Sequence, residues 1–322
     1  HKEKMILLVK DTLLFLLTIA NKKRNIFRGK VIGITGSVGK TSIKENLKHL
    51  LSTQGKISTA IKSYNNYLGV LISLINIDLY SNFAIFEVGT NNFNEIKKLT
   101  SIIMPHQVII TNIFPTHLKN FKNTRNVAIE KSDLFNPKYN PCTELLVLPN
   151  SNEDEVYLSK LSRKYKINSV ITFGRNNEAN YCLQNIEIVN NFLSKIKIKT
   201  PNELIECQVS TSIEHQIINI IISLIIFKYN ELKIDDFLKK AQNISFVEGR
   251  GLFHELKIKD NYVTLIDESY NASPISMKNC INYFENFFVE NNQRKILILG
   301  EMNELGESAF DYHKEIVIFA LK

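Results

Sequence analysis

The chain has 322 residues, of which 44% are hydrophobic and 22% charged, a balance typical of a folded globular protein that argues against intrinsic disorder. The formal net charge of +8 comes from scattered lysines, so it does not predict a nucleic-acid-binding surface. No stretch reaches the roughly 18 apolar residues of a membrane span, and four widely separated cysteines without zinc-site spacing indicate a reducing cytoplasm.

A glycine-rich loop follows the first predicted strand. Residues 30–34 form a short apolar run, Gly33–Ser42 reads GITGSVGKTS, and a helical pattern comes next. In this order, backbone N–H groups and the positive end of the helix dipole point at an anion. We therefore predict a nucleotide-binding loop, with Lys40 at the outer phosphates and Thr41 on a magnesium ion. Ile34 stands where the strict P-loop pattern has glycine.

Apolar runs and helical patterns alternate along the next part of the chain. Strands are expected at 83–88, 107–111 and 145–148, and helices at 93–100 and 126–135. This alternation predicts an α/β fold with a mostly parallel sheet covered by helices. Shorter alternating runs between residues 169 and 206 predict an antiparallel β patch, and residues 213–229 read as a helix.

A new unit is expected to start near Gly249–Gly251. After this point the pattern predicts strands at 263–267 and 295–299, a helix at 276–288, and a final helix from Phe310 to the last residue. The length of the chain is also that of two domains rather than one. We therefore expect a domain boundary at the glycine pair.

Polar groups stand where predicted strands end. Glu87 ends an apolar strand, at the edge of an α/β sheet where ligands bind, and is a natural magnesium ligand. Asp267 ends another strand and could accept hydrogen bonds from ribose hydroxyls, although Ser273-Pro274 could equally begin the next helix. Taken alone, His117 reads as a structural or surface histidine, and Glu130–Asp133 as a solvated charge cluster.

Taken together, nine motifs resemble those of the Mur ligases. In chain order they are GITGSVGKTS, YNNYLGV, FEVGTN, TNIFPTHLKNF, VAIEKSDLF, EHQIIN, GR, DESYNASPISM and LGEMNELG. The last two favour the members that join D-Ala-D-Ala to UDP-MurNAc-tripeptide in peptidoglycan precursor synthesis. Gln216 stands where the family usually has asparagine, so one polar contact near the adenine is expected to differ.

The resemblance implies a domain organisation. Residues 29–249 would be the central ATP-binding domain, with a P-loop and a mostly parallel sheet, and residues 250–322 the start of a Rossmann-like C-terminal domain. Residues 1–28 would be the linker helix from an N-terminal domain that the chain lacks. Because the family has three domains, we expect a fragment that binds ATP but does not complete the reaction alone.

The resemblance also implies the site of a carboxylate-activating ligase that uses ATP and Mg²⁺. The catalytic residues would be Lys40, His117 and Lys131. The metal ligands would be Thr41, Glu87, His117 and Lys131, with Lys131 carbamylated. The nucleotide would contact Gly36, Ser37, Val38, Gly39, Lys40, Thr41, Ser42, Asn219 (adenine), Arg250 (phosphates), Asp267 (ribose), Tyr270 and Asn271.

The implied reaction proceeds through an acyl phosphate, with UDP-MurNAc-tripeptide and D-Ala-D-Ala as substrates and a monomer as the expected state. Two alternatives stay open. A sister Mur ligase or a folylpolyglutamate-type enzyme would add a different amino acid, and a lapsed ATP-binding subunit would keep the nucleotide site without the chemistry. A P-loop GTPase is disfavoured because the chain has no NKxD segment for guanine.

Overall fold

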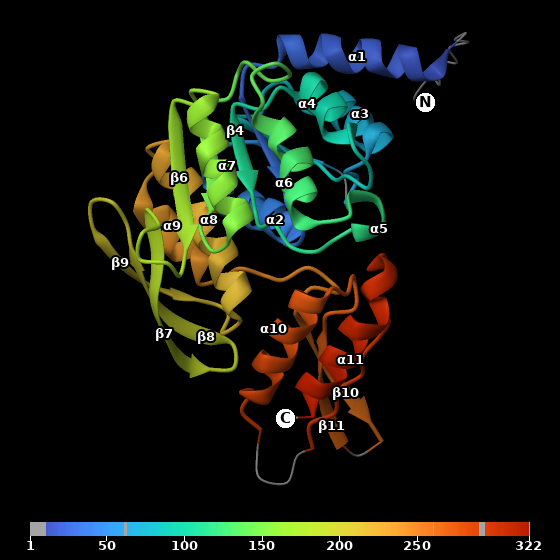
Figure 1. The fold of residues 1–322 in the computed structure, drawn as a ribbon. Helices are drawn as coiled ribbons and strands as arrows, with labels where there is room; N and C mark the ends of the chain where they lie inside the picture. Colours follow the sequence, from blue (N-terminus) through green and yellow to red (C-terminus); the bar gives the residue numbers. More distant parts are fainter. Residues whose placement is uncertain (1–10, 61–62, 260, 290–293, 322) are drawn as a thin grey trace, which may run out of the picture.

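A nine-stranded sheet organises the first two thirds of the chain (Figure 1). The computed structural model describes residues 11–60, 63–259, 261–289 and 294–321. The strand order is β2-β3-β1-β4-β5-β6-β7-β8-β9. The strands are β1 (Lys30–Thr35), β2 (Ile57–Thr59), β3 (Phe83–Glu87), β4 (Gln107–Ile110), β5 (Leu145–Pro149), β6 (Ser169–Gly174), β7 (Tyr181–Asn190), β8 (Leu193–Lys199) and β9 (Leu204–Val209).

The sheet is parallel from β2 through β7 and antiparallel from β7 through β9. The predicted α/β class with a mostly parallel sheet is therefore confirmed. The expected antiparallel patch is wrong for β6, which pairs in parallel with β5. The helix Glu153–Lys164, which the sequence reading did not identify, connects these two strands and makes the parallel arrangement possible.

Helices cover both faces of the sheet. They are α1 (Thr12–Ile26), α2 (Lys40–Leu51), α3 (Tyr67–Ile75), α4 (Glu95–Ile103), α5 (Leu118–Phe121), α6 (Thr124–Ser132), α7 (Glu153–Lys164), α8 (Glu214–Tyr229) and α9 (Ile234–Ala241). Residues 1–10 of the expected linker helix lie outside the described residues. None of the helices in the described part of the chain has the length and apolarity needed to cross a bilayer.

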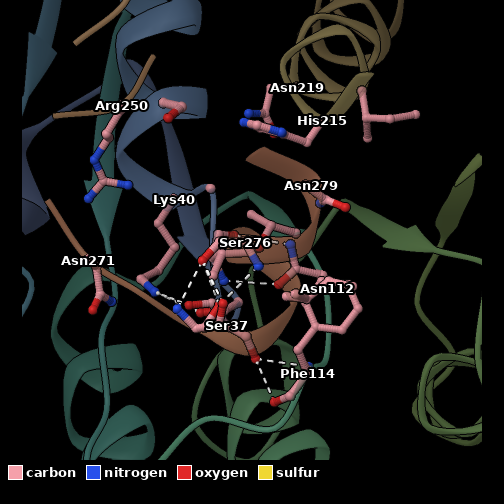
Figure 2. A pocket seen from close by; sticks show the side chains of 18 of the residues that line it. Ser37, Lys40, Asn112, Phe114, His215, Asn219, Arg250, Asn271, Ser276 and Asn279 are labelled. Carbon is pink, nitrogen blue, oxygen red and sulfur yellow. Dashed lines mark hydrogen bonds between the residues drawn. The ribbon is translucent and has the colours of Figure 1, made fainter. Parts of the chain in front are cut away.

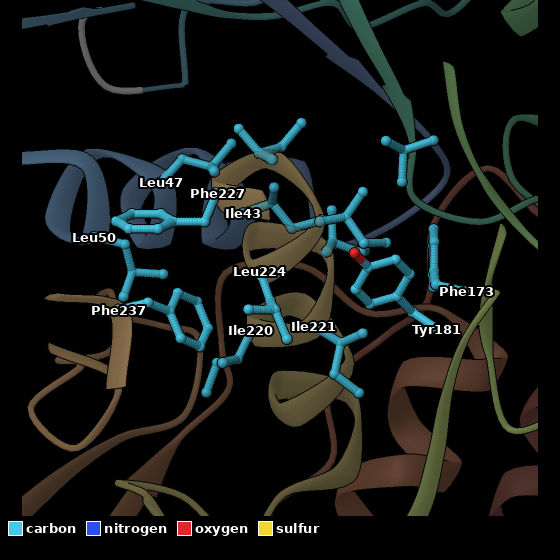
Figure 3. Close-up of a cluster of buried hydrophobic side chains, with 14 of the residues drawn as sticks. Ile43, Leu47, Leu50, Phe173, Tyr181, Ile220, Ile221, Leu224, Phe227 and Phe237 are labelled. Atoms are coloured by element: carbon cyan, nitrogen blue, oxygen red, sulfur yellow. The ribbon is translucent and has the colours of Figure 1, made fainter. Parts of the chain in front are cut away.

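Side-chain alternation along β1 divides the core between the two faces. Val31 packs in the cluster formed with α3, α4, α6 and α7, whereas Ile32 and Ile34 pack in the cluster formed with α2, α8 and α9. Figure 3 shows the second cluster, in which Phe227 of α8 lies near Leu47 of α2. Helix α8 is apolar on nearly every side because it is buried on nearly every side.

Residues 250–321, here called the C-terminal unit, contain β10 (Leu252–Ile258), β11 (Asn261–Asp267), α10 (Pro274–Glu285) and α11 (Ala309–Ala320). In Figure 1 this unit lies on one side of the larger unit, here called the central unit (residues 29–249). β10 and β11 form an antiparallel pair. α11 begins close to the predicted Phe310, and residue 322 lies outside the described residues.

The predicted strand at 295–299 is wrong. These residues have no regular secondary structure, and the side chains of Ile296 and Ile298 are 72% and 89% exposed. A strand needs a neighbouring backbone to satisfy its N–H and C=O groups. Among the described residues, the sheet of the C-terminal unit consists of β10 and β11, which pair with each other. The apolar sequence of 295–299 alone was therefore insufficient to make a strand.

Candidate active site

A cavity of about 820 Å³ lies between the two units (Figure 2). Its walls come from the glycine loop after β1, the ends of β3 and β4, the start of α8, and α10 with the loop before it. β1 lies between β3 and β4 in the sheet, so the loop that follows it sits beside the carboxyl ends of both neighbours. This is the position in an open α/β sheet where ligands bind.

The glycine loop needs its glycines. Gly36 has φ of 148° and a Cβ there would lie 1.8 Å from Thr111 Oγ1. Gly39 has φ of 87° and caps the N-terminus of α2 without a side-chain hydrogen bond. The first N–H groups of α2 are therefore available to a ligand at the positive end of the helix dipole.

The loop after β4 holds the glycine loop in shape. Ser37 N donates to Asn112 O at 3.1 Å, and Val38 N donates to Asn112 Oδ1 at 2.9 Å. Ser37 Oγ donates to Phe114 O at 3.1 Å (Figure 2). Sequence reasoning did not assign Asn112 or Phe114 to the site, although the TNIFPTHLKNF motif places both directly after a strand end.

Lys40 lies inside the loop that it is predicted to serve. Its Nζ donates to Gly36 O at 2.7 Å. Burial lowers the pKa of Lys40 to about 8, with Glu87 opposing the shift and Arg250 adding to it. The Arg250 guanidinium lies 4.1 Å from the centre of the Tyr270 ring, and its buried Nε has no hydrogen-bond partner within the described residues. Two cations therefore face the same space, which favours an anionic ligand.

Thr41 and Glu87 meet at the floor of the cavity. Thr41 Oγ1 donates to Glu87 Oε2 at 2.9 Å, and the fully buried Glu87 also pairs with Lys44 at 3.1 Å between Nζ and Oε1. A hydroxyl and a carboxylate oxygen next to a phosphate loop are the donors that Mg²⁺ takes alongside phosphate oxygens and water. These two side chains therefore fit the predicted magnesium site.

Lys131 faces the cavity, whereas its neighbour Glu130 does not. Glu130 accepts hydrogen bonds from Asn94 N at 2.7 Å and Ile96 N at 2.9 Å, at the start of α4, so its role is structural. Lys131 is 3% exposed, and burial, followed by the charge of Lys40, lowers its pKa well below the usual value. The amine is therefore held toward its neutral, nucleophilic form. This environment differs from the solvated cluster that the sequence alone suggested.

His117 lies at the cavity wall near the C-terminal unit. It has φ of 52°, and its Nδ1 contacts the carboxylate of Glu304 from the C-terminal unit. Burial lowers the pKa of His117; Glu304 opposes this shift, and Lys131 adds to it. The residues that the structure describes contain no cluster of three or more His, Cys, Asp or Glu side chains at metal-binding spacing. His117 and Lys131 both line the cavity.

Asn219 and His215 lie one helical turn apart on α8, and both line the cavity (Figure 2). A Cβ on Gly39 would lie 3.3 Å from Asn219 Oδ1, so α8 approaches the glycine loop closely. Burial lowers the pKa of His215 to about 4. Glu214 forms two hydrogen bonds with Arg175, of 2.9 and 2.8 Å, and both residues line the cavity.

The C-terminal unit closes the cavity with Arg250, Tyr270 and Asn271. The structure does not bring Asp267 to the cavity wall: its carboxylate accepts hydrogen bonds from Gly249 N at 3.0 Å and Ser269 Oγ at 2.6 Å. Glu268, which sequence reasoning did not assign, lines the wall instead, and burial raises its pKa to about 7. The other predicted site residues line the cavity: Gly36, Ser37, Val38, Gly39, Lys40, Thr41, Ser42, Glu87, His117, Lys131, Asn219, Arg250, Tyr270 and Asn271.

The chain is similar to proteins of known name. A family model described as the Mur ligase middle domain matches residues 34–227. A UDP-N-acetylmuramoyl-tripeptide--D-alanyl-D-alanine ligase from Rickettsia prowazekii is 31% identical over 316 residues, which are 98% of this chain and 68% of that protein.

Two solved structures have the same fold. MurF from Acinetobacter baumannii has a TM-score of 0.84 at 24% identity, covering 96% of this chain and 65% of its own. MurF ligase from Thermotoga maritima, in complex with ADP, has a TM-score of 0.84 at 23% identity, covering 99% of this chain and 70% of its own. The chain thus spans about two thirds of the length of these relatives.

Proposed function

The chain belongs to the Mur ligase family, as its motifs indicated, and we propose that it carries the ATP-binding and catalytic part of an enzyme that joins D-Ala-D-Ala to the peptide carboxylate of UDP-MurNAc-tripeptide. One observation carries the proposal. A buried lysine with a strongly lowered pKa, Lys131, shares a cavity with a phosphate loop and with the Thr41–Glu87 pair. An ordinary nucleotide-binding protein has no need of such an amine.

The proposed reaction must bring two anions together. The peptide carboxylate attacks the γ-phosphorus of ATP, an acyl phosphate forms, and ADP leaves. Lys40, Arg250 and the N–H groups of the glycine loop place positive charge where this repulsion develops. The amine of D-Ala-D-Ala then attacks the acyl carbon, an amide forms with loss of a proton from nitrogen, and inorganic phosphate leaves.

The two-unit cavity suits this intermediate because water hydrolyses acyl phosphates. The glycine loop and the α10 side of the cavity belong to different units, so a bound nucleotide would lie between them. Contacts between the units would then keep water from the reacting carbonyl. Tyr270 and Asn271 are proposed to lie against the nucleotide from the C-terminal unit, and Asn219 to contact the adenine.

One magnesium ion would be held by Thr41 and Glu87, and a second by His117 and Lys131. The two ions would neutralise phosphate charge and orient the phosphoryl group. We propose that Lys131 serves the second ion as a carbamate, formed when its neutral amine bonds the carbon of CO₂ and loses a proton. The lowered pKa of Lys131 supports the step because only the unprotonated amine can attack CO₂.

A cytoplasmic enzyme is proposed because all four cysteines, Cys142, Cys182, Cys207 and Cys280, are free thiols. UDP-MurNAc-tripeptide and D-Ala-D-Ala are the proposed substrates, and a monomer remains the prediction for the oligomeric state.

The test is phosphate release by the natural gene product that contains this chain. ATP, Mg²⁺ and UDP-MurNAc-tripeptide are supplied with and without D-Ala-D-Ala. We expect release that requires the dipeptide and that is lost in Lys40→Ala. The matched control is Lys48→Ala, a change on the same helix at a side chain that is 54% exposed.

Three other outcomes would contradict the proposal. Release that requires a different amine would indicate a sister ligase. ADP binding without release in the presence of any amine would indicate a lapsed ATP-binding subunit. A failure to bind ADP at all would show that the chain has no nucleotide site. ADP binding can be measured on the 322-residue chain alone.

A further inference from the structure

The turn between β7 and β8 reaches the C-terminal unit. Residues 190–192, here called the hairpin tip, belong to the central unit by sequence and to the nine-stranded sheet by strand pairing. Asn191 Nδ2 donates to Phe288 O at 2.8 Å, and Phe288 N donates to Asn191 Oδ1 at 2.9 Å. One amide side chain thus satisfies both backbone groups of a single residue, as a paired strand would.

The backbone of the same residue makes two more contacts. Asn191 O accepts hydrogen bonds from Tyr283 Oη at 3.1 Å and from Ser212 Oγ at 2.7 Å. A tyrosine hydroxyl is protonated at neutral pH and can donate, and burial raises the pKa of Tyr283 further, to about 12. Asn191 therefore joins three segments: the hairpin tip, the loop before α8 and the C-terminal end of α10.

Aromatic packing surrounds these hydrogen bonds. Phe192 of the hairpin tip packs edge-on against Phe253 of β10, with ring centres 4.7 Å apart, and against Phe287, at 6.3 Å. Phe253 and Phe287 stack at 5.9 Å, and Tyr283 packs edge-on against Phe287 at 5.7 Å. Pairs of this kind favour one geometry over others. The contact between the hairpin tip and the C-terminal unit is therefore directional as well as apolar.

This contact holds one wall of the cavity. Ser276, Asn279 and Tyr283 of α10 line the cavity, as does Ser212. Asn191 does not line it. At the opposite side of the same unit, Glu304 contacts His117, and the short 3₁₀ helix Gly306–Ser308 lies against α5. The C-terminal unit thus contacts the central unit at two separated points, and α10 takes part in the contact with the hairpin tip.

We propose that Asn191 is a positioning residue, which fixes α10 and thereby the C-terminal wall of the nucleotide cavity. The inference rests on the proposed nucleotide site. Its physical basis is that the carboxamide supplies a donor and an acceptor in one plane, matched to the two backbone groups of Phe288. An aspartate side chain at this position would lack the donor, and an alanine side chain would lack both groups. We therefore expect a graded loss in Asn191→Asp and Asn191→Ala.

Binding of two ligands distinguishes a loss of α10 positioning from a general loss of folded structure. ADP would reach the α10 wall of the C-terminal unit, whereas inorganic tripolyphosphate would need only the glycine loop and Arg250. The backbone of Arg250 is bonded to the central unit, through Val247 O at 2.9 Å and Gln216 Nε2 at 3.3 Å. We expect Asn191→Ala to raise the Kd for ADP about 10-fold, the equivalent of one to two hydrogen bonds, and to change the Kd for tripolyphosphate less than about twofold. Asn191→Asp should fall between. The matched control is Asn202→Ala, at an exposed position in the β8–β9 turn.

Hydrogen exchange gives a second measurement that does not depend on a ligand. In Asn191→Ala, amide exchange should rise in residues 274–288 and remain unchanged in residues 40–51 of α2. An unchanged Kd for ADP, or an equal loss of affinity for ADP and tripolyphosphate, would overturn the proposal. If the unmodified protein bound neither ligand, the proposed nucleotide site would fail and this inference with it.

Discussion

The two units of this protein differ greatly in the number of buried hydrophobic side chains that form their cores. In the central unit, both faces of the sheet are covered, and one strand such as β1 contributes completely buried side chains to two clusters. In the C-terminal unit, the buried cluster consists of Ile281, Met302, Leu305 and Ile316, and β10 pairs with β11 without a further strand among the described residues.

Exposure follows the same division. Tyr262, Ile298 and Phe310 of the C-terminal unit are 72%, 89% and 76% exposed. A two-stranded pair with a small core is marginally stable by itself. The packing of the central unit can therefore fix the shape of the glycine loop. The position of the opposite wall of the cavity depends on contacts between the two units. The shape of the glycine loop therefore depends on the central unit, and the rest of the cavity is sensitive to how the two units meet.

The largest expected effect is on the central core. Phe227 is fully buried on α8, with its ring centre 5.5 Å from that of Phe237. Phe227→Ala should lower the free energy of unfolding by about 3–5 kcal/mol, measured by urea denaturation with circular dichroism. Ile281→Ala in the C-terminal cluster should cost less, about 2 kcal/mol, because its partly exposed surroundings can collapse onto the space. An equal or larger loss for Ile281→Ala would contradict the comparison.

The second prediction concerns the chemistry of the central unit. Lys131→Arg keeps a cation but cannot form a carbamate, so ligation should fall about 10²-fold or more. With ¹³C-labelled bicarbonate, the unmodified protein should give a carbamate signal in NMR that Lys131→Arg lacks. The exposed Lys138 offers the control Lys138→Arg. Full activity in Lys131→Arg, or no carbamate signal in the unmodified protein, would remove Lys131 from the proposed role.

A pH effect is expected from His215. Burial lowers its pKa to about 4, below the usual value of 6.5, so between these values the unfolded chain binds more protons than the folded one. The free energy of unfolding should therefore fall as pH decreases from 6.5 to 4. His215→Gln should show a shallower fall, by about 1–3 kcal/mol over this range, in urea titrations at several pH values. Identical pH profiles for the two proteins would show that burial does not hold the imidazole neutral.

The smallest effect compares two thiols. Burial raises the pKa of Cys207 in the central unit to about 11 and that of Cys280 on α10 to about 12. Both should react slowly with iodoacetamide at about pH 8, because little thiolate is present. Cys280 lines the cavity, so ADP should slow its labelling a further few-fold and leave Cys207 unchanged. Protection of both thiols alike would indicate a general tightening, not occupation of the cavity.

Much of the central unit could be read from local patterns. The glycine loop was predictable because its backbone conformation requires glycine at defined positions. At Gly36, for example, a Cβ would clash with the side chain of Thr111. Strands β1, β3, β4 and β5 were predictable because a buried parallel strand is a short apolar run between turns. The segment 295–299 has the same composition but no adjacent backbone, so composition failed there.

The sequence by itself determined the family, the glycine loop and the type of sheet, because each depends on short-range geometry and on motifs in a defined order. Tertiary structure alone decided the state of individual side chains. Lys131 and Glu130 are neighbours in a charged run. The fold nevertheless buries the Lys131 amine at the cavity and uses the Glu130 carboxylate to cap the start of α4. The burial of a group and the charges around it depend on segments that are distant in the chain. For the same reason, the contacts of Asn191 with Phe288 and Tyr283 could not be predicted from the sequence.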